Sequence, residues 1–126
     1  MSTPIEYLAA GKLVKSAAKD EAMYRAAINR LYYASFHASR AYYAALPHLG
    51  KSSGTGSHEQ LITSLANPSD KLTAAKRNTS IALSKVLRTL CQRRVKADYH
   101  PDDVVEEGDM LRADLEADSI FGGTKI

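Results

Sequence analysis

Apolar residues recur at three- and four-residue steps between Asp20 and Leu46, and this pattern constrains the fold more than any other. Such steps place side chains on one face of an α-helix. That face comprises Tyr24, Ala27, Ile28, Leu31, Ala34, Ala38, Ala41, Tyr42 and Ala45. A second apolar stripe beside it comprises Tyr32, Phe36, Tyr43 and Leu46. A helix that is apolar on more than one face is central to a bundle or buries one face against another chain. We therefore expect a long central helix with Asp20 as its N-cap and Pro47 after its end.

The remaining segments predict further helices and no β-sheet, because none of them alternates apolar and polar residues over a sustained run. Residues 47–57 are rich in Gly and Ser and indicate a flexible loop. Four other helices are expected, over about residues 4–18, 58–66, 72–98 (or 79–98) and 102–120. Ser57 is the expected N-cap of the second of these four. The sequence thus predicts an all-α fold, an up-and-down bundle of four to five helices with two long central helices.

Length and composition allow one domain over residues 1–126, with its core over about 5–120. No apolar run approaches the roughly 18 residues that span a bilayer, and the N-terminus does not resemble a secretory signal. The lone Cys91 excludes an internal disulfide and fits a reducing compartment, so we expect a cytoplasmic protein with no membrane partner. Its helical neighbours predict a core thiol, with a reactive thiol as the alternative.

Charge is unevenly distributed, although the formal net charge is only +3. Residues 71–96 carry eight cations and no acid, whereas residues 98–118 carry nine acids and one Arg. This balance permits an anionic partner such as nucleic acid, but a basic and an acidic helix that pair within the fold would give the same pattern. The histidines are dispersed along the chain, so no metal site and no cofactor is expected. They are His37, His48, His58 and His100.

Arg94 falls on the apolar face of the second long helix, seven residues after Leu87. A charge on a buried face requires a partner. Asp98, one turn later, can supply it through an ion pair; a phosphate in a cleft and groups across a dimer interface are the alternatives. Arg93 lies further from the apolar face and is expected in solvent. His100 ends the helix, and a permanent cation near an imidazole can bind a phosphate and move a proton.

A polar row lies on the first long helix, where Arg30, Tyr33, His37 and Arg40 are spaced by 3, 4 and 3 residues. This spacing places all four side chains on one helical face. The row can line the same cleft as Arg94. Alternatively, Tyr33 and His37 are interfacial core residues whose polar tips are hydrogen-bonded.

Two motifs together resemble a known family. The first is the run NRLYYASFHA over residues 29–38; the second is the run RVKADY over residues 94–99, and His58 lies in the segment between them. Their order and spacing resemble the HEPN domain family, in particular its small stand-alone prokaryotic branch with YYAxFHA and RxxADY motifs. The resemblance covers about residues 5–120.

This resemblance implies an all-α bundle of four or five helices that is usually a homodimer. Active members of the family are metal-independent endoribonucleases in which the Arg-to-His motifs of two protomers face each other across a shared cleft. Many are toxins encoded beside a small nucleotidyltransferase antitoxin, and others have lost catalysis and bind RNA or a partner. Arg94 matches the family arginine, and His100 stands where a catalytic histidine is expected. Val95 departs from the pattern, because active members usually carry a polar residue directly after the arginine.

The expected function is therefore metal-independent cleavage of RNA to 2′,3′-cyclic phosphate ends, as the toxin of a HEPN/nucleotidyltransferase toxin–antitoxin system. Arg94 would bind the scissile phosphate, and His100 would transfer protons. Substrate would also contact Arg93, Tyr99, Arg30, Tyr33, His37 and Arg40, with Tyr99 either stacking on a base or packing in the core. One alternative is a catalytically inactive HEPN module that binds nucleotides, RNA or a partner protein. The other is a structural helical protein in which Arg94 and Asp98 form only an ion pair.

Overall fold

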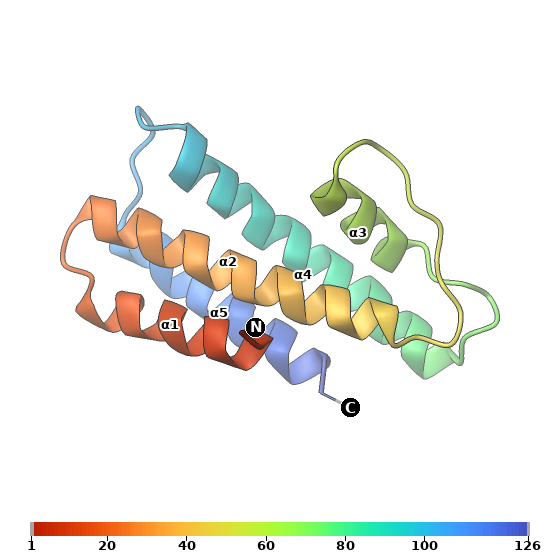
Figure 1. The fold of residues 1–126 in the computed structure, drawn as a ribbon. Coiled ribbons are helices and arrows are strands. Elements are labelled where there is room, and N and C mark those ends of the chain that lie inside the picture. Colours follow the sequence, from red (N-terminus) through yellow and green to blue (C-terminus); the bar gives the residue numbers. More distant parts are fainter. Residues whose placement is uncertain (1, 126) are drawn as a thin grey trace.

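The computed structural model describes residues 2–125, which form five helices joined by loops (Figure 1). No strand occurs among these residues, so the predicted all-α bundle is confirmed. No helix within them has the length and apolar character needed to cross a membrane. The helices are α1 (Pro4–Ala17), α2 (Glu21–Ala44), α3 (Ser57–Ala66), α4 (Ala74–Tyr99) and α5 (Glu107–Gly123).

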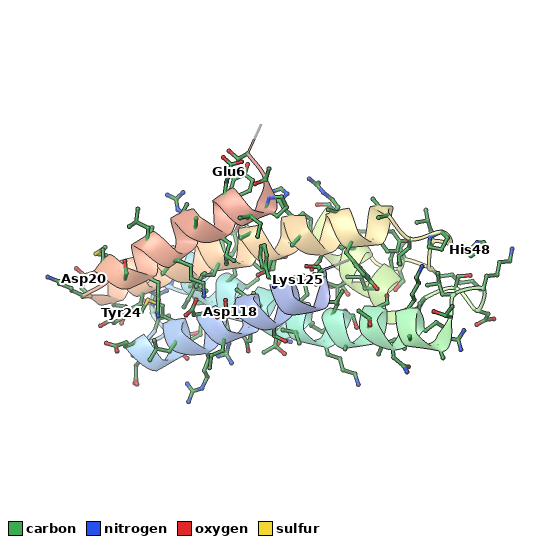
Figure 2. All side chains as sticks on the ribbon, turned by 90° about the horizontal axis from the view of Figure 1, so that it is seen from below. Glu6, Asp20, Tyr24, His48, Asp118 and Lys125 are labelled. Atoms are coloured by element: carbon green, nitrogen blue, oxygen red, sulfur yellow. The ribbon has the colours of Figure 1, made fainter. Side chains whose placement is uncertain are left out.

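Helix α2 is the central element. Helix α1 runs antiparallel along it from its N-terminal end, α4 and α5 pack against it from behind, and the short α3 packs beside α4 (Figure 1). Because α2 runs the length of the bundle, Asp20 before it and His48 after it lie at opposite ends of the molecule (Figure 2). The predicted apolar face is buried from Ala27 to Ala38, but its last members Ala41 and Ala45 are exposed.

The helix starts follow local capping chemistry. Thr3 and Glu6 form a reciprocal capping box around Pro4, and the Asp20 carboxylate accepts from the backbone N–H of Met23 at 2.9 Å, as predicted. The predicted Ser57 cap is wrong. Helix α3 already includes Ser57, and Gly56 is its N-cap with a φ of 89°, a backbone conformation that favours glycine.

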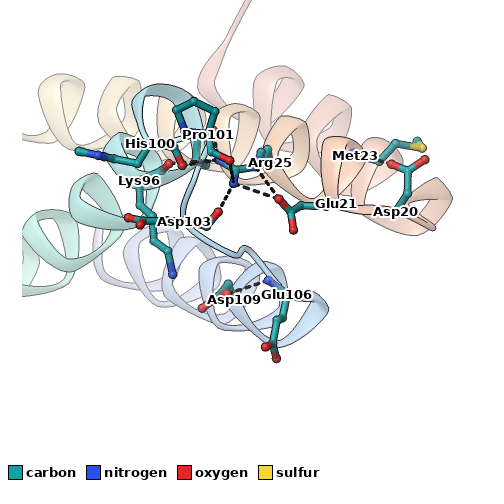
Figure 3. Close-up of polar contacts among 11 residues, drawn as sticks. Asp20, Glu21, Met23, Arg25, Lys96, His100, Pro101, Asp103, Glu106 and Asp109 are labelled. Atoms are coloured by element: carbon teal, nitrogen blue, oxygen red, sulfur yellow. Dashed lines mark hydrogen bonds and ion pairs between the residues drawn. The ribbon is translucent and has the colours of Figure 1, made fainter.

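The predicted start of the last helix at residue 102 is also wrong, because α5 begins five residues later at Glu107. The reason is a contact with a distant part of the chain. The Arg25 guanidinium donates to the carbonyls of Lys96, Ala97, His100, Pro101 and Asp103 (Figure 3). These bonds satisfy the free carbonyls at the end of α4 and hold residues 100–103 as a bend. Val105 is then buried, at 2% exposure, before the helix begins.

Replacement of Arg25 by Gln should destabilise the protein. The Arg25 side chain is only 15% exposed, and the shorter amide cannot reach carbonyls on both sides of the bend. Leaving partly buried carbonyls unpaired costs about 1–3 kcal/mol, so the urea midpoint should fall clearly. Arg30→Gln is the matched control, because Arg30 is exposed on the same helix and should change stability by less than about 0.5 kcal/mol. Equal midpoints for the two variants would contradict this role of Arg25.

The loop over residues 47–57 is anchored to the bundle at several points. The N–H of Gly50 donates to the Tyr43 hydroxyl at 3.0 Å, that of Lys51 to the Asn67 carbonyl at 3.1 Å, and that of Ser53 to Thr63 Oγ1 at 2.9 Å. A Cβ atom on Gly50 would overlap the carbonyl oxygens of Ser64 and Asn67. The position therefore requires glycine because the two backbones approach closely.

We expect Gly50→Ala to lower the free energy of unfolding by about 1–3 kcal/mol, since neither backbone oxygen can move without disturbing α3. Gly122→Ala is the control, because a Cβ there meets nothing within 4 Å. It should leave the protein as stable as wild type or slightly more stable. Thermal unfolding followed by circular dichroism measures both; an unchanged Tm for Gly50→Ala would show that the loop adjusts freely.

The opposite charges of the last two helices pair in part within the fold. Arg93 binds the Glu116 carboxylate with two hydrogen bonds of 2.8 and 3.0 Å. On the other side of α5, Lys12 of α1 lies 2.5 Å from Asp114 and 2.6 Å from Asp118. The alternative of charge pairing within the bundle therefore accounts for some of the uneven distribution. It also places Arg93 against α5 rather than in solvent.

Candidate functional site

Arg94 is the centre of a cluster of aromatic and polar side chains. Its side chain is 12% exposed. Nη2 donates to the Tyr33 hydroxyl at 2.8 Å and to the Tyr99 hydroxyl at 3.3 Å. The guanidinium lies 5.7, 5.2 and 5.1 Å from the ring centroids of Tyr32, Tyr33 and Tyr99, within the range of cation–π attraction. The two sequence motifs, about 60 residues apart, are thus in contact through Arg94 and Tyr33.

Asp98 provides the countercharge for Arg94. Its Oδ2 lies 2.9 Å from Arg94 Nε, as an ion pair one helical turn apart, and it also accepts from Asn29 Nδ2 at 2.8 Å. The Nε–H does not point at this oxygen, so the pair is electrostatic and is not a linear hydrogen bond. Arg94 Nη1 has no hydrogen bond within residues 2–125 and is not sealed from solvent. One donor of a permanently charged group therefore remains available to a ligand.

His58 is the histidine that the structure brings to this cluster. It lies in the first turn of α3, half-buried, with Nδ1 2.5 Å from the Tyr32 hydroxyl. Its ring lies 4.5 Å from that of Phe36 and 5.9 Å from that of Tyr33, between centroids. Burial, and then the charge of Arg94 and the neighbouring His37, lower the pKa of His58 below its ordinary value. His58 is therefore neutral at neutral pH and lies within the electrostatic reach of Arg94.

The polar row of α2 continues the cluster along the helix. Tyr33 binds Arg94, as described above. One turn further, His37 stacks on Tyr7 of α1 with ring centroids 5.0 Å apart, and its Nδ1 lies 3.2 Å from Arg40 Nη2. Burial and the Arg40 charge lower the pKa of His37. Arg30 and Arg40 are exposed, whereas Tyr33 and His37 are half-buried. Tyr33 and His37 therefore lie at the border between core and solvent with hydrogen-bonded polar tips, and Tyr33 also contacts Arg94.

The other predicted site residues lie at different places. Tyr99 is 63% exposed and forms the rim of the cluster through its bond to Arg94. Arg93 is bound to Glu116 of α5 and faces away from the cluster. His100 is exposed at the C-cap of α4, beside the carbonyls that Arg25 holds (Figure 3).

His100 lines a groove of about 410 Å³ between α3 and α4. The groove is lined on the α4 side by Cys91, Val95 and Lys96, and Arg94 is not part of its lining. Within a single copy, the predicted Arg94–His100 pair is therefore not brought together. That pairing remains a prediction that would require the His100 of a second copy.

His58 could have been found from the sequence. His58, Leu61, Ile62 and Leu65 are spaced by 3, 1 and 3 residues, which places the histidine on the apolar face of its short helix. A histidine on a buried face needs a polar partner, and the buried aromatic stripe of α2 offers one in Tyr32. The sequence does not reveal which helix α3 packs against, so it does not reveal that this face meets Arg94.

No family model matches this chain, and no similar protein was found among curated proteins or solved structures. Within residues 2–125, no three His, Cys, Asp or Glu side chains are grouped so that they could hold a metal ion. The chemistry of the cluster is therefore inferred from its own groups. These are a cation with a free donor, a neutral imidazole and exposed aromatic surface.

Proposed function

We propose that this protein is a HEPN-type, metal-independent endoribonuclease that acts as the toxin of a toxin–antitoxin pair in the cytoplasm. The observation that supports this proposal is the contact between the two motifs of the resemblance. Arg94 of the second motif donates to the Tyr33 hydroxyl of the first, and Asp98 accepts from Asn29 of the first. The residues that carry the resemblance thus form one partly accessible cluster. A cluster that served only for packing would not need a half-buried cation with a free donor.

The proposed chemistry uses the two groups that remain available. Arg94 binds the scissile phosphate through Nη1 and stabilises the charge of the phosphorane. His58, neutral at neutral pH, accepts the proton of the ribose 2′-hydroxyl at Nε2, which has no partner within residues 2–125 and is not sealed from solvent. The 2′-oxygen then attacks phosphorus, and the bond to the 5′-oxygen breaks. The products are a 2′,3′-cyclic phosphate and a 5′-hydroxyl.

The leaving 5′-oxygen needs a proton, and we propose that a second copy of the chain supplies the acid. In a homodimer that shares one cleft, two Arg94–His58 pairs would face the RNA, with one histidine as base and the protonated histidine of the other copy as acid. Sedimentation or light scattering should then give the mass of a dimer at the concentrations where RNA is cleaved. Cleavage by a protein that stays monomeric would exclude this arrangement.

Incubation of the purified protein with RNA in EDTA tests the activity. The proposal predicts cleavage without metal, products with cyclic phosphate ends, and no reaction at a site where the 2′-hydroxyl is replaced by hydrogen. Cleavage of DNA, or cleavage that EDTA abolishes, would exclude the mechanism. Growth arrest on expression, relieved by the product of an adjacent nucleotidyltransferase gene, would support the toxin role separately.

A second candidate is a catalytically inactive HEPN module that binds RNA or docks a partner such as a nucleotidyltransferase. The specific observation that favours it is that Arg94 already has Asp98, Tyr33 and Tyr99 as partners, while His100 lines a groove to which Arg94 does not contribute. RNA binding with no cleavage under the same conditions would identify this module.

A further inference from the structure

Most of the cations over residues 71–96 are not neutralised within the fold. Three of the eight, all arginines, form ion pairs with acids of the bundle, and they are Arg88, Arg93 and Arg94. The other five have no ion pair within residues 2–125, and they are Lys71, Lys76, Arg77, Lys85 and Lys96. Four of these five lie between residues 71 and 85, in the first half of α4 and just before it. Charge pairing within the bundle therefore does not account for this basic end.

A pocket of about 570 Å³ lies at the basic end, between the loop over residues 47–57 and the turn that joins α3 to α4. The two segments run side by side (Figure 1), and the N–H of Lys51 in the loop donates to the Asn67 carbonyl at the end of α3 at 3.1 Å. Gly50 lets the two backbones approach closely, as described above. The volume falls within the range of about 300–1,000 Å³ that is usual for small-molecule sites. The pocket is thus formed by anchored backbone and is large enough for a ligand.

Three cations from three segments line this pocket, namely Lys51 of the loop, Lys71 of the turn and Arg77 of α4. Arg77 is half-buried, and its Nη1 donates to the backbone carbonyls of Asp70 and Leu72. Its Nε and Nη2 have no hydrogen bond within residues 2–125 and are not sealed from solvent. Among the described residues of the lining, Asp70 is the one acid, so three cations face one carboxylate. A fixed guanidinium with two free donors beside two free lysines suits a phosphate group.

The same pocket has an apolar wall. Leu49 is 59% exposed and lines it together with the half-buried Pro68 and Ile81. A nucleotide presents both a charged phosphate and the flat face of a base, so it can use the cations and this wall at once. An acidic peptide would use the cations but has no such face for the wall. The combination therefore favours a nucleotide over an acidic protein segment.

We propose that this pocket binds one nucleotide of a single-stranded RNA, with its phosphate on Arg77, Lys51 and Lys71 and its base against Leu49. Arg77 and Arg94 are 17 residues apart on α4, which corresponds to about 25 Å along the helix. The pocket is therefore a second RNA contact, away from the Arg94 cluster, and only an RNA that spans about 25 Å reaches both. Its value as a substrate contact rests on the proposed ribonuclease activity, whereas binding itself can be measured without cleavage.

Fluorescence anisotropy with a labelled single-stranded 2′-O-methyl RNA of about 12 nucleotides tests the pocket, since this RNA has no free 2′-hydroxyl and is not cleaved. The double variant Lys51→Gln/Lys71→Gln should raise Kd by about 10-fold and lower the slope of log K against log salt by roughly 0.7 for each lost phosphate contact. Arg77 is left unchanged, because its bonds to backbone carbonyls support the turn. Matching Tm values establish that the variants are folded.

The matched control is Lys19→Gln/Arg112→Gln. It removes the same charge from two exposed residues that do not line the pocket, and Lys19 lies beside Asp20 at the end of the molecule opposite His48 (Figure 2). Its Kd and salt slope should stay close to those of wild type. Equal values for the two double variants would overturn the inference. So would wild-type binding of polyglutamate in place of RNA, or binding of adenosine monophosphate as tight as that of the RNA, because the ligand would then be an acidic protein or a free nucleotide.

Cleavage separates this inference from the proposed activity. In Lys51→Gln/Lys71→Gln, the ratio of kcat/KM for a long RNA to kcat/KM for a dinucleotide should fall by about 10-fold, because a dinucleotide cannot span both sites. An unchanged ratio in an active enzyme would overturn the pocket as a substrate contact. Wild type that binds the 2′-O-methyl RNA through the pocket but cleaves no RNA would support the pocket and refute the ribonuclease proposal instead.

Discussion

Replacement of Arg94 by Lys should lower the rate of RNA cleavage by about 10²–10³-fold while leaving the fold intact. Lysine keeps the charge near Asp98 but lacks the planar guanidinium. In wild type this group binds Tyr33 and Tyr99 through Nη2 and leaves Nη1 for a phosphate. The loss should appear in kcat, since the phosphorane gains more from this group than the ground-state phosphate.

Arg112→Lys is the matched control for Arg94→Lys. Arg112 is exposed on α5 and makes no ion pair within residues 2–125, so this variant should cleave RNA at the wild-type rate. Single-turnover cleavage and Tm should be measured for both proteins. If Arg94→Lys cleaves as fast as wild type, or loses activity only in proportion to a lowered Tm, Arg94 has a structural role and no direct part in catalysis.

Replacement of His58 by Asn should lower cleavage by about 10²–10⁴-fold. For wild type, the rate should rise with pH as the His58 that acts as base becomes neutral, and fall at higher pH as the His58 of the second copy that acts as acid loses its proton. Because burial, Arg94 and His37 lower the pKa of His58, the midpoint of this rise should lie below the ordinary value of 6.5. The rate falls at low pH because a protonated His58 cannot accept the 2′-hydroxyl proton. The acidic limb should be absent in His58→Asn.

His48→Asn serves as the control for His58→Asn, since His48 is exposed in the loop at the far end of α2 (Figure 2). It should leave both rate and pH profile unchanged. His100→Asn is the informative comparison. If it abolishes cleavage while His58→Asn does not, the catalytic pair is Arg94 with His100, as the sequence predicted, and a second copy must contribute one of them.

The parts of the fold that follow from neighbouring residues could be predicted. The two stripes of α2, the Asp20 cap and the i,i+4 pair of Arg94 with Asp98 all follow from local spacing. The start of α5 could not be predicted, because it depends on Arg25 binding carbonyls about 75 residues later in the chain. Local helical signals at residues 101–103 were outweighed by this tertiary contact.

The same distinction between local spacing and tertiary contact applies to the candidate site. Arg94, Tyr99 and Tyr33 were identified from the motifs and do lie together. Arg93 was expected in solvent, and its bond to Glu116 depends on the packing of α5 beside α4. His100 follows Arg94 closely in sequence, yet α4 ends there, Arg25 binds its backbone carbonyl, and it lines a groove to which Arg94 does not contribute. The position of His58 depends on the docking of α3, which periodicity does not specify.

The central claim is that Arg94 and His58 act as one catalytic unit on RNA, and a double-mutant cycle tests it most directly. Single-turnover cleavage in EDTA should be measured for wild type, Arg94→Lys, His58→Asn and the double variant. If the two groups act together, the double variant should be about as slow as the slower single variant, because either change alone disables the unit. If the two losses multiply, or if His58→Asn cleaves at the wild-type rate, the groups do not form one site and the account is contradicted.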